Sequence, residues 1–198
     1  SGGFDDTGCV KISSTEKTAQ AVKHKLTGLD RGRLYRFSAR VKREGVEDGR
    51  GAVLYLGPEG MDQPWNASEF AYGSEGWTEV YVDFVPDDAG EAVVCCGLGF
   101  PWGTYNGGKA SGAVWFDDVR VEPAPEELIY SAESKYLTLR LDRDKVTIAD
   151  ADIRKWLSNL DRVYDAYYDL VGGVPFDGER IMILNTPGIE PGYWALAG

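Results

Sequence analysis

The sequence predicts a mainly β protein, an antiparallel β-sandwich followed by a small, incomplete α/β segment. Apolar and polar residues alternate with a period of two in most segments up to residue 122, and glycine-rich turns separate these segments. Only one segment, 150–170, shows clear helical periodicity, and it lies beyond the proline-containing stretch 123–125. Strands that follow one another without intervening helices favour a sandwich for the first part of the chain.

Seven strands are expected in this first part. The clearest is 35–41, where apolar residues at the odd positions alternate with polar residues at the even ones. Segment 92–100 is almost wholly apolar, so we expect it to lie centrally in its sheet. The seven expected strands are 9–13, 20–26, 35–41, 51–56, 77–85, 92–100 and 114–121.

The pattern changes after residue 125. One strand is expected at 136–141, a helix at 150–170 and a second strand at 180–184. We expect Asp150 or Asp152 to cap the start of the helix and the two glycines at 172–173 to end it. The apolar stripe of the helix consists of Trp156, Leu160, Val163, Tyr167 and Leu170.

These patterns suggest two domains. We assign residues 1–124 to the sandwich, 125–132 to a linker and 133–198 to the second segment. The helical stripe needs a cover, and about 70 residues rarely form a sufficient core alone, so the second segment is expected to be the truncated beginning of a larger domain. Within it, Trp156, Tyr164 and Tyr167 are expected to pack the helix.

The charge balance argues against two classes of partner. The 198-residue chain has a formal net charge of −11. Such a surface repels the phosphates of nucleic acids and anionic membranes, whereas neutral sugars are indifferent to it. No apolar run approaches the roughly 18 residues of a membrane span. We therefore expect neither nucleic acid nor membrane as a partner.

The cysteines leave two alternatives open. Cys95 and Cys96 are adjacent in an expected strand, so they point to opposite faces and cannot share one partner. Either Cys9 bridges one of them, or all three are buried thiols, which behave as small apolar groups.

The sequence contains no recognisable catalytic set. A zinc-peptidase site needs two histidines on one helix face, and a serine-hydrolase triad needs one histidine near an activated serine. His24 is the single histidine of the chain, and it lies in an expected strand, where we predict that it faces solvent. The many carboxylates fall mostly in turns, so we interpret them as a solvated acidic surface rather than as glycosidase pairs.

Residues 8–122 resemble the jelly-roll carbohydrate-binding modules of the xylan- and glucan-binding type, which are attached to secreted bacterial enzymes such as glycoside hydrolases. The resemblance implies a jelly roll that binds polysaccharide. Such modules usually begin with an extra strand and an Asn-Pro-Gly-Phe-Glu-like segment, neither of which precedes Gly8. The segments that carry the resemblance are Gly8–Ile12, Leu26–Leu29, Leu34–Lys42, Gly76–Val80 and Val114–Val121.

The second segment is loosely similar to the lead-in of a secreted zinc metallopeptidase of the His-Glu-x-x-His type, a gluzincin. The similarity is carried by the helix 153–168, the turn 173–178 and the strand 180–184. With one histidine in the whole chain, no zinc site can form within it.

Aromatic residues in the two long loops are the candidate sugar platform. Trp65, Trp102 and Tyr105 lie among glycine and polar residues, where an exposed ring needs a reason. The alternative for the two tryptophans is loop anchoring, whereas Trp77 and Trp115 are expected in the core or at a sheet edge, because alternation continues through them. Side chains predicted to line a cleft between the loops are Asn106, Arg40, Lys42, Tyr55, Tyr81 and Asp83.

A structural calcium ion is the cofactor that the sequence suggests. We expect Asp117 to face the core together with Val119 and Val121, and a buried carboxylate must be paired or bound to a metal. The resembling modules often carry calcium near this strand, and oxygen ligands suit that ion. The expected ligands are Asp117 and Asp118, completed by Asp5, Asp6 and backbone carbonyls; the alternative is a carboxylate bonded to backbone amides.

The sequence thus predicts a secreted bacterial protein, extracellular or at the cell surface. Its sandwich is expected to be a non-catalytic module that brings the remaining domains of a parent hydrolase to polysaccharide or glycan. The alternative is a structural or accessory domain without sugar binding, followed by the N-terminal fragment of a zinc metallopeptidase.

Overall fold

The computed structural model describes residues 2–6, 8–57, 66–101, 108–143, 147–173 and 180–184. The chain forms two compact units, and the division falls between Ala124 and Pro125. Each unit has its own buried apolar cluster, as an independent domain requires.

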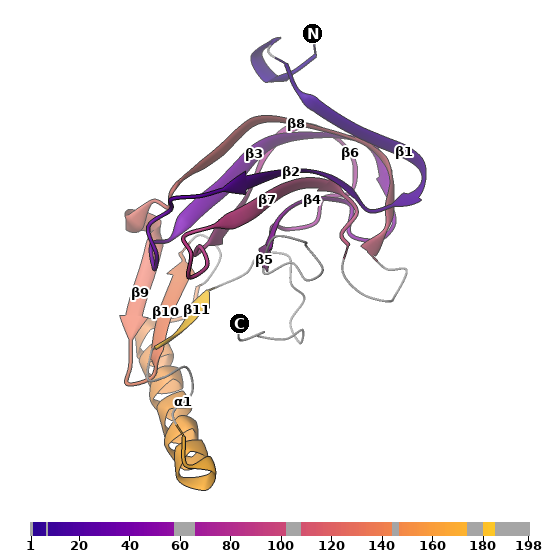
Figure 1. Ribbon diagram of the computed structural model, residues 1–198. Coiled ribbons are helices and arrows are strands. Elements are labelled where there is room, and N and C mark those ends of the chain that lie inside the picture. Colours follow the sequence, from indigo (N-terminus) through magenta and orange to yellow (C-terminus); the bar gives the residue numbers. More distant parts are fainter. Residues whose placement is uncertain are drawn as a thin grey trace. The chain divides into compact units, whose positions relative to one another are not determined.

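The first unit is an antiparallel sandwich of two four-stranded sheets (Figure 1). Sheet A has the order β1-β8-β3-β6, and sheet B has the order β2-β7-β4-β5. Apart from β4 and β5, strands that are consecutive in the chain lie in different sheets, as in a jelly roll. The strands are β1 (Val10–Thr18), β2 (Gln20–Leu26), β3 (Tyr35–Glu47), β4 (Ala52–Gly57), β5 (Asn66–Ala67), β6 (Gly73–Phe84), β7 (Ala92–Leu98) and β8 (Ala110–Pro123).

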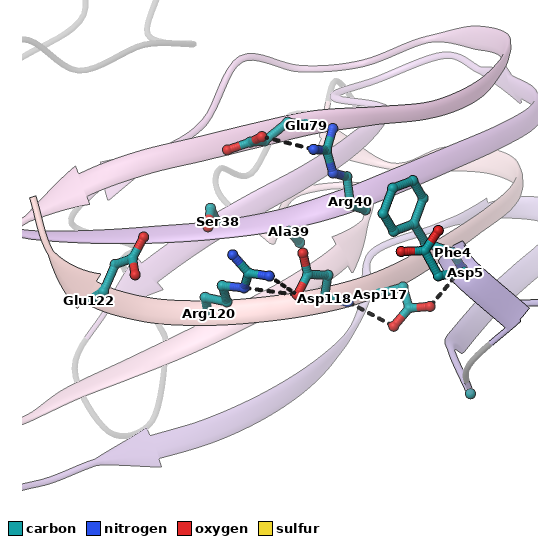
Figure 2. Close-up of a pocket in the computed structure, with 11 residues that line it drawn as sticks. Phe4, Asp5, Ser38, Ala39, Arg40, Glu79, Asp117, Asp118, Arg120 and Glu122 are labelled. Carbon is teal, nitrogen blue, oxygen red and sulfur yellow. Dashed lines mark hydrogen bonds and ion pairs between the residues drawn. The ribbon is translucent and has the colours of Figure 1, made fainter. Parts of the chain in front are cut away.

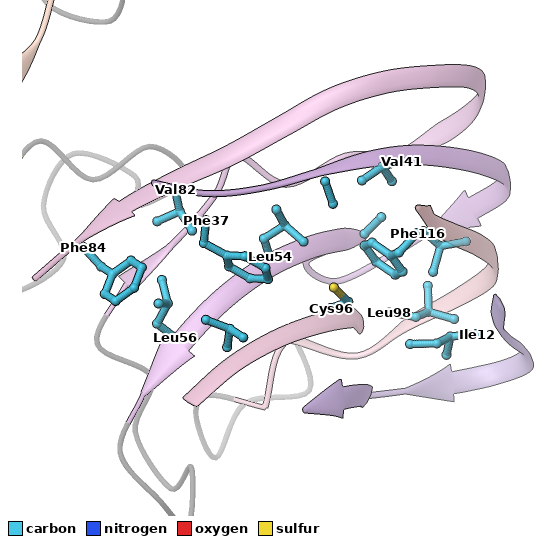
Figure 3. Close-up of a cluster of buried hydrophobic side chains, with 14 of the residues drawn as sticks. Ile12, Phe37, Val41, Leu54, Leu56, Val82, Phe84, Cys96, Leu98 and Phe116 are labelled. Atoms are coloured by element: carbon cyan, nitrogen blue, oxygen red, sulfur yellow. The ribbon is translucent and has the colours of Figure 1, made fainter. Parts of the chain in front are cut away.

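The core lies between the two sheets and confirms the predicted sandwich (Figure 3). Phe37 and Phe116 from sheet A and Leu54 and Leu98 from sheet B are each at most 1% exposed. All seven expected strands are present; some, such as β3, alternate between core and outer face, whereas β4 and β7 are buried along their whole length. Strand β5 escapes prediction, since its two residues are too few for a period to show.

The second unit, Pro125–Asn185, contains a three-stranded sheet and one helix. The sheet has the order β11-β10-β9, with β10 (Leu137–Asp142) antiparallel to β9 (Ile129–Glu133) and parallel to β11 (Ile181–Leu184). Segment 125–132, which we expected to be a linker, instead contains the 3-10 turn η3 (Glu126–Leu128) and most of β9. Pairing with β10 explains this strand, which its own sequence does not announce.

Helix α1 (Asp150–Val171) packs a different stripe from the one we predicted. The side chains in the core are Ile153 and Leu157, with Leu160 and Tyr164 packed against them. The predicted stripe lies about 60° round the helix, so only Leu160 belongs to both sets. Its other members are exposed, with exposed fractions of 45% at Trp156, 62% at Val163, 53% at Tyr167 and 83% at Leu170.

The ends of α1 match the prediction only in part. Gly172 ends the helix in a left-handed conformation, with φ 72°, as its sequence position predicts. The N-cap is Ala149, and neither Asp150 nor Asp152 caps the start with its side chain. Both carboxylates lie inside the first turn, where their negative charge interacts favourably with the positive end of the helix dipole.

Asp161 of α1 fastens the helix to the β9–β10 turn. Its two carboxylate oxygens accept hydrogen bonds from the Ser134 hydroxyl and from the backbone N–H groups of Lys135 and Tyr136, at 2.9, 3.1 and 3.2 Å. One turn further on, Asp165 accepts from the Lys135 ammonium and the Tyr136 hydroxyl.

We predict that Asp161→Ala destabilises the second unit by about 1–2 kcal/mol, because two backbone donors lose their acceptor. Amide hydrogen exchange of residues 137–142 should accelerate accordingly. The matched control is Asp169→Ala, which removes an exposed carboxylate from the same helix. Equal exchange rates in the two variants would show that the turn does not depend on Asp161.

Candidate functional site

The outer face of sheet A carries four of the predicted sugar contacts. Arg40 and Lys42 extend outward from β3 because the residues between and beside them, Ala39 and Val41, belong to the core. Tyr81 and Asp83 extend outward from β6 by the same alternation, and pairing across the strands places Tyr81 opposite Ser38. The period of two therefore identified this face correctly.

A β-bulge in β8 gives this face its shape. Ser38 pairs with Arg120 and Arg40 pairs with Asp117, so β8 uses one more residue than β3 between these two pairs. The extra residue is Asp118, which has φ 49°. The bulge shifts the alternation by one residue, so Val121 packs against the core whereas Asp117 faces outward beside Arg40.

The expected orientation of Asp117 was therefore wrong. A continuous alternation would have placed it on the core side with the two valines, but the bulge lies between them. Val119 is 48% exposed and is not a core residue either.

The bulge opens a depression of about 570 Å³ on the outer face (Figure 2). Phe4 of η1 (Phe4–Asp6) forms one wall: its ring lies 5.0 Å from the Arg40 guanidinium and meets the Trp77 ring edge-on at 6.2 Å. The lining residues are Phe4, Asp5, Gly8, Ser38, Ala39, Arg40, Glu79, Asp117, Asp118, Arg120 and Glu122.

Donors and acceptors are balanced in this depression. Arg40 pairs with Glu79 at 3.4 Å, and Arg120 pairs with Asp118 at 2.7 Å. Asp117 accepts the backbone N–H of Phe4 on one oxygen and that of Asp118 on the other, both at 2.7 Å. The arrangement offers fixed hydrogen-bonding groups of both kinds to a polar ligand.

Asp83 and Tyr81 form a brace beside the depression. Arg36 donates two hydrogen bonds to the Asp83 carboxylate, at 2.8 and 2.9 Å, and its guanidinium lies 3.9 Å from the centre of the Tyr81 ring. Asp83 is only 5% exposed. A bidentate pair this buried holds β3 and β6 together and leaves the carboxylate little freedom to meet a ligand.

Trp115 lies on the same outer face, on an inner strand of sheet A. We expected it in the core or at a sheet edge, but its neighbours Val114 and Phe116 take the core positions. Trp77 does lie on the edge strand β6, in agreement with the expectation. The alternation that placed Arg40 on the outer face also places Trp115 there, so the outward orientation of Trp115 could have been predicted from the sequence.

Tyr55 lies on the other sheet, away from the remaining predicted contacts. It belongs to an apolar cluster on the outer face of sheet B, where it packs edge-on against Phe100 at 5.3 Å and is 2% exposed. Burial raises the pKa of the Tyr55 hydroxyl above its ordinary value, and it raises the pKa of the neighbouring Cys95 thiol to about 12. The structure thus assigns Tyr55 a packing role.

The loop residues Trp65, Trp102, Tyr105 and Asn106 lie outside the described residues. The first loop joins β4 to β5, both in sheet B. The base of the second is closed by a hydrogen bond from the Phe100 N–H to the Gly108 carbonyl, and Phe100 packs in the sheet B cluster. Tyr55 lies on sheet B, whereas Arg40, Lys42, Tyr81 and Asp83 lie on sheet A, so these five predicted contacts do not line one cleft.

The predicted calcium ligands are partly assembled. Asp5, Asp117 and Asp118 all line the depression, whereas the Asp6 side chain lies outside what the structure describes. Asp118 is paired with Arg120, and Asp117 has the backbone amide bonds that were the alternative to calcium. Within the described residues, no three His, Cys, Asp or Glu side chains converge as metal ligands. Calcium binding stays a prediction.

His24 matches its prediction, and the cysteines match the free-thiol alternative except that Cys9 is only partly buried. His24 is exposed on β2, as predicted. Cys9, Cys95 and Cys96 are free thiols. Cys96 lies in the inter-sheet core and Cys95 in the sheet B cluster, so the two point to opposite faces. Among the residues described, no helix is long and apolar enough to cross a membrane.

Comparison with solved structures adds a likeness in fold. No family model matches the chain. No curated protein matches it either. A solved structure described as "CBM4 structure and function" matches with a TM-score of 0.38 and 20% identity, over 52% of this chain and 60% of that one. The chain thus spans less than two thirds of that structure.

The bulge gives a testable prediction at Asp118. Its positive φ tolerates Asn but not a β-branched residue, so Asp118→Val should destabilise the first unit by about 1–2 kcal/mol more than Asp118→Asn does. Both variants lose the charge that pairs with Arg120, which makes Asn the matched control. Urea unfolding of the two would give equal midpoints if the bulge were absent.

The calcium prediction is tested by thermal unfolding with calcium and with a chelator. A ligand held only by the folded state stabilises it by about 2.7 kcal/mol at a hundredfold excess over its Kd. We expect calcium to raise the melting temperature of the wild type but not of Asp117→Asn. Identical melting curves for the wild type in calcium and in chelator would contradict calcium binding, and the backbone amides would then be the partners of Asp117.

Proposed function

We propose that the sandwich unit is a non-catalytic module that binds polysaccharide or glycan on the outer face of sheet A. The observation that supports this most is the depression formed by the β8 bulge. Its volume of about 570 Å³ is within the ~300–1,000 Å³ typical of small-ligand sites. It combines fixed polar groups with an aromatic wall, and a sugar needs both.

The lining suits the chemistry of a pyranose ring. Sugar hydroxyls both donate and accept hydrogen bonds, and the depression offers arginine donors at Arg40 and Arg120 beside acceptors at Glu79 and Glu122. The apolar C–H face of a sugar packs on an aromatic ring, which Phe4 supplies. Most of the residues that line the depression are charged or polar, which favours a ligand rich in hydroxyl groups over an apolar one.

Binding rather than hydrolysis is favoured by the state of the carboxylates. Glycosidases need one carboxyl group that carries a proton and one that does not. Here Asp118 and Glu79 are each held in an ion pair with an arginine, so the protein itself engages both carboxylates rather than leaving them as a free pair. We therefore propose an equilibrium binder that raises the local concentration of an attached catalytic domain on its substrate.

Several further features belong to this proposal. We propose that the module is secreted and that it acts together with the remaining domains of a parent hydrolase. Affinity at a single site is expected to be weak, because hydroxyl groups gain little over the water that they displace. Trp65 and Trp102 stay predicted sugar contacts.

Affinity electrophoresis on xylan, β-glucan and mucin tests the proposal. We expect the wild type to be retarded by at least one polymer, and Arg40→Ala with Arg120→Ala to weaken binding about tenfold, the loss of one to two charge-assisted hydrogen bonds. The matched control is Arg154→Ala with Arg162→Ala, which removes two arginines from the exposed face of α1. Unchanged melting temperatures would confirm that all variants fold.

The variant Trp65→Ala with Trp102→Ala distinguishes binding through the loops from binding in the sheet A depression. If it alone abolishes retardation, the module binds sugar through the loops and the sheet A depression is not the site. A wild type that is retarded by none of the polymers would overturn sugar binding and leave a structural role for the sandwich.

A further inference from the structure

Three side chains form one row across sheet A, next to the depression. Lys11 of β1 pairs with Trp115 of β8, and Trp115 pairs with Lys42 of β3. All three extend from the outer face, because Ile12, Phe116 and Val41 occupy the core positions beside them. The row is thus fixed by strand register rather than by flexible loops.

Both lysine ammonium groups lie over the indole of Trp115. The Lys11 Nζ is 4.7 Å and the Lys42 Nζ 5.2 Å from the ring centre. The two nitrogens are therefore no farther apart than those distances added together. Both nitrogens are thus close enough to Trp115 for one sugar residue that carries an anionic group to reach them.

The two lysines differ from the neighbouring cations of sheet A in having no acidic partner among the described residues. The arginines of this face are each paired with a carboxylate within 4 Å. These pairs are Arg36 with Asp83, Arg40 with Glu79 and Arg120 with Asp118. An exposed cation–π contact is weak, so the ammonium groups stay available to a stronger partner.

We infer that this row binds an anionic sugar, one that carries a carboxylate or a sulfate ester. The anion would contact the ammonium groups beside Trp115, and the apolar part of the sugar would contact the indole, which is only half-buried. This inference rests on the proposed function and names the class of glycan. The depression begins two residues further along β8 and β3, about 7 Å away, so one oligosaccharide can span both.

The net charge of −11 does not exclude such a ligand. At physiological ionic strength, exposed charges are screened beyond roughly 8 Å, so distant carboxylates contribute little at this row. Two ammonium groups in contact with the anion act at hydrogen-bond distance, where screening is weak. The local field therefore decides, and within the row it is positive.

The test compares polygalacturonate with its carboxyl-reduced derivative, two polymers that differ only in the charged group. We expect the wild type to bind the acidic polymer about tenfold more tightly, as one charge-assisted contact predicts. Lys11→Met with Lys42→Met keeps the aliphatic stems over the indole and should abolish this preference. The control Lys23→Met with Lys155→Met removes two exposed lysines elsewhere and should preserve it. A sulfated galactan and its desulfated form, run in parallel, show whether sulfate replaces carboxylate.

The outcomes separate this inference from the proposed function. Equal binding of the charged and neutral forms, or a preference that persists in Lys11→Met with Lys42→Met, would overturn the anionic site but leave sugar binding intact. Retardation by neutral xylan or β-glucan with none by either acidic polymer has the same meaning. Failure to bind any polymer would remove both proposals together. Trp115→Ala should weaken binding of charged and neutral polymers alike.

Discussion

The packing of apolar side chains between the two sheets is the interaction on which the rest of the first unit depends. Phe37 and Phe116 meet Leu54 and Leu98 in one cluster with almost no exposed surface. At about 25 cal/mol per Å² of buried apolar area, each such side chain contributes roughly 1.5–3 kcal/mol, more than an exposed ion pair of the outer face. A strand directs successive side chains to opposite faces, so fixing the core also fixes which residues point outward. The outer face of sheet A is thus a consequence of the core.

One residue interrupts this rule and creates the site. If β8 were regular, without the bulge at Asp118, Phe116 and Val121 would point to opposite faces of the strand, and one of the two would leave the core. The bulge lets both pack against the cluster, and it does so where Arg40 and Arg120 flank Asp117. The same irregularity that preserves the apolar core therefore opens the polar depression, so core packing and the proposed binding site are coupled through one backbone conformation.

Sequence reasoning succeeded where a feature is local and failed where it depends on pairing. The period of two predicted seven strands and the outward face of Arg40, because the signal lies within each strand. The bulge at Asp118 has no periodic signature, so the orientation of Asp117 was missed. Tyr55 was assigned to one cleft with Arg40 because a single sequence does not say which sheet each strand enters, and Tyr55 belongs to the other sheet. In α1, apolar residues cover more of the helix surface than the part that packs against the sheet. Periodicity alone therefore could not identify the face containing Ile153 as the buried one.

The cations of the outer face divide it into two parts with different chemistry. Arginine has a planar fork that matches a carboxylate, and Arg36 uses it to hold Asp83 in a buried bidentate pair. Lysine is a point charge on a flexible stem, and Lys11 and Lys42 rest on Trp115 without a carboxylate among the described residues. The Arg36–Asp83 pair stabilises the sheet, whereas the ammonium groups of Lys11 and Lys42 stay available to an anionic ligand. Strand register places both parts on one face of the sheet. A ligand that reaches from the depression to Trp115 therefore meets groups whose backbone is already in position, and the protein loses little conformational entropy when the ligand binds.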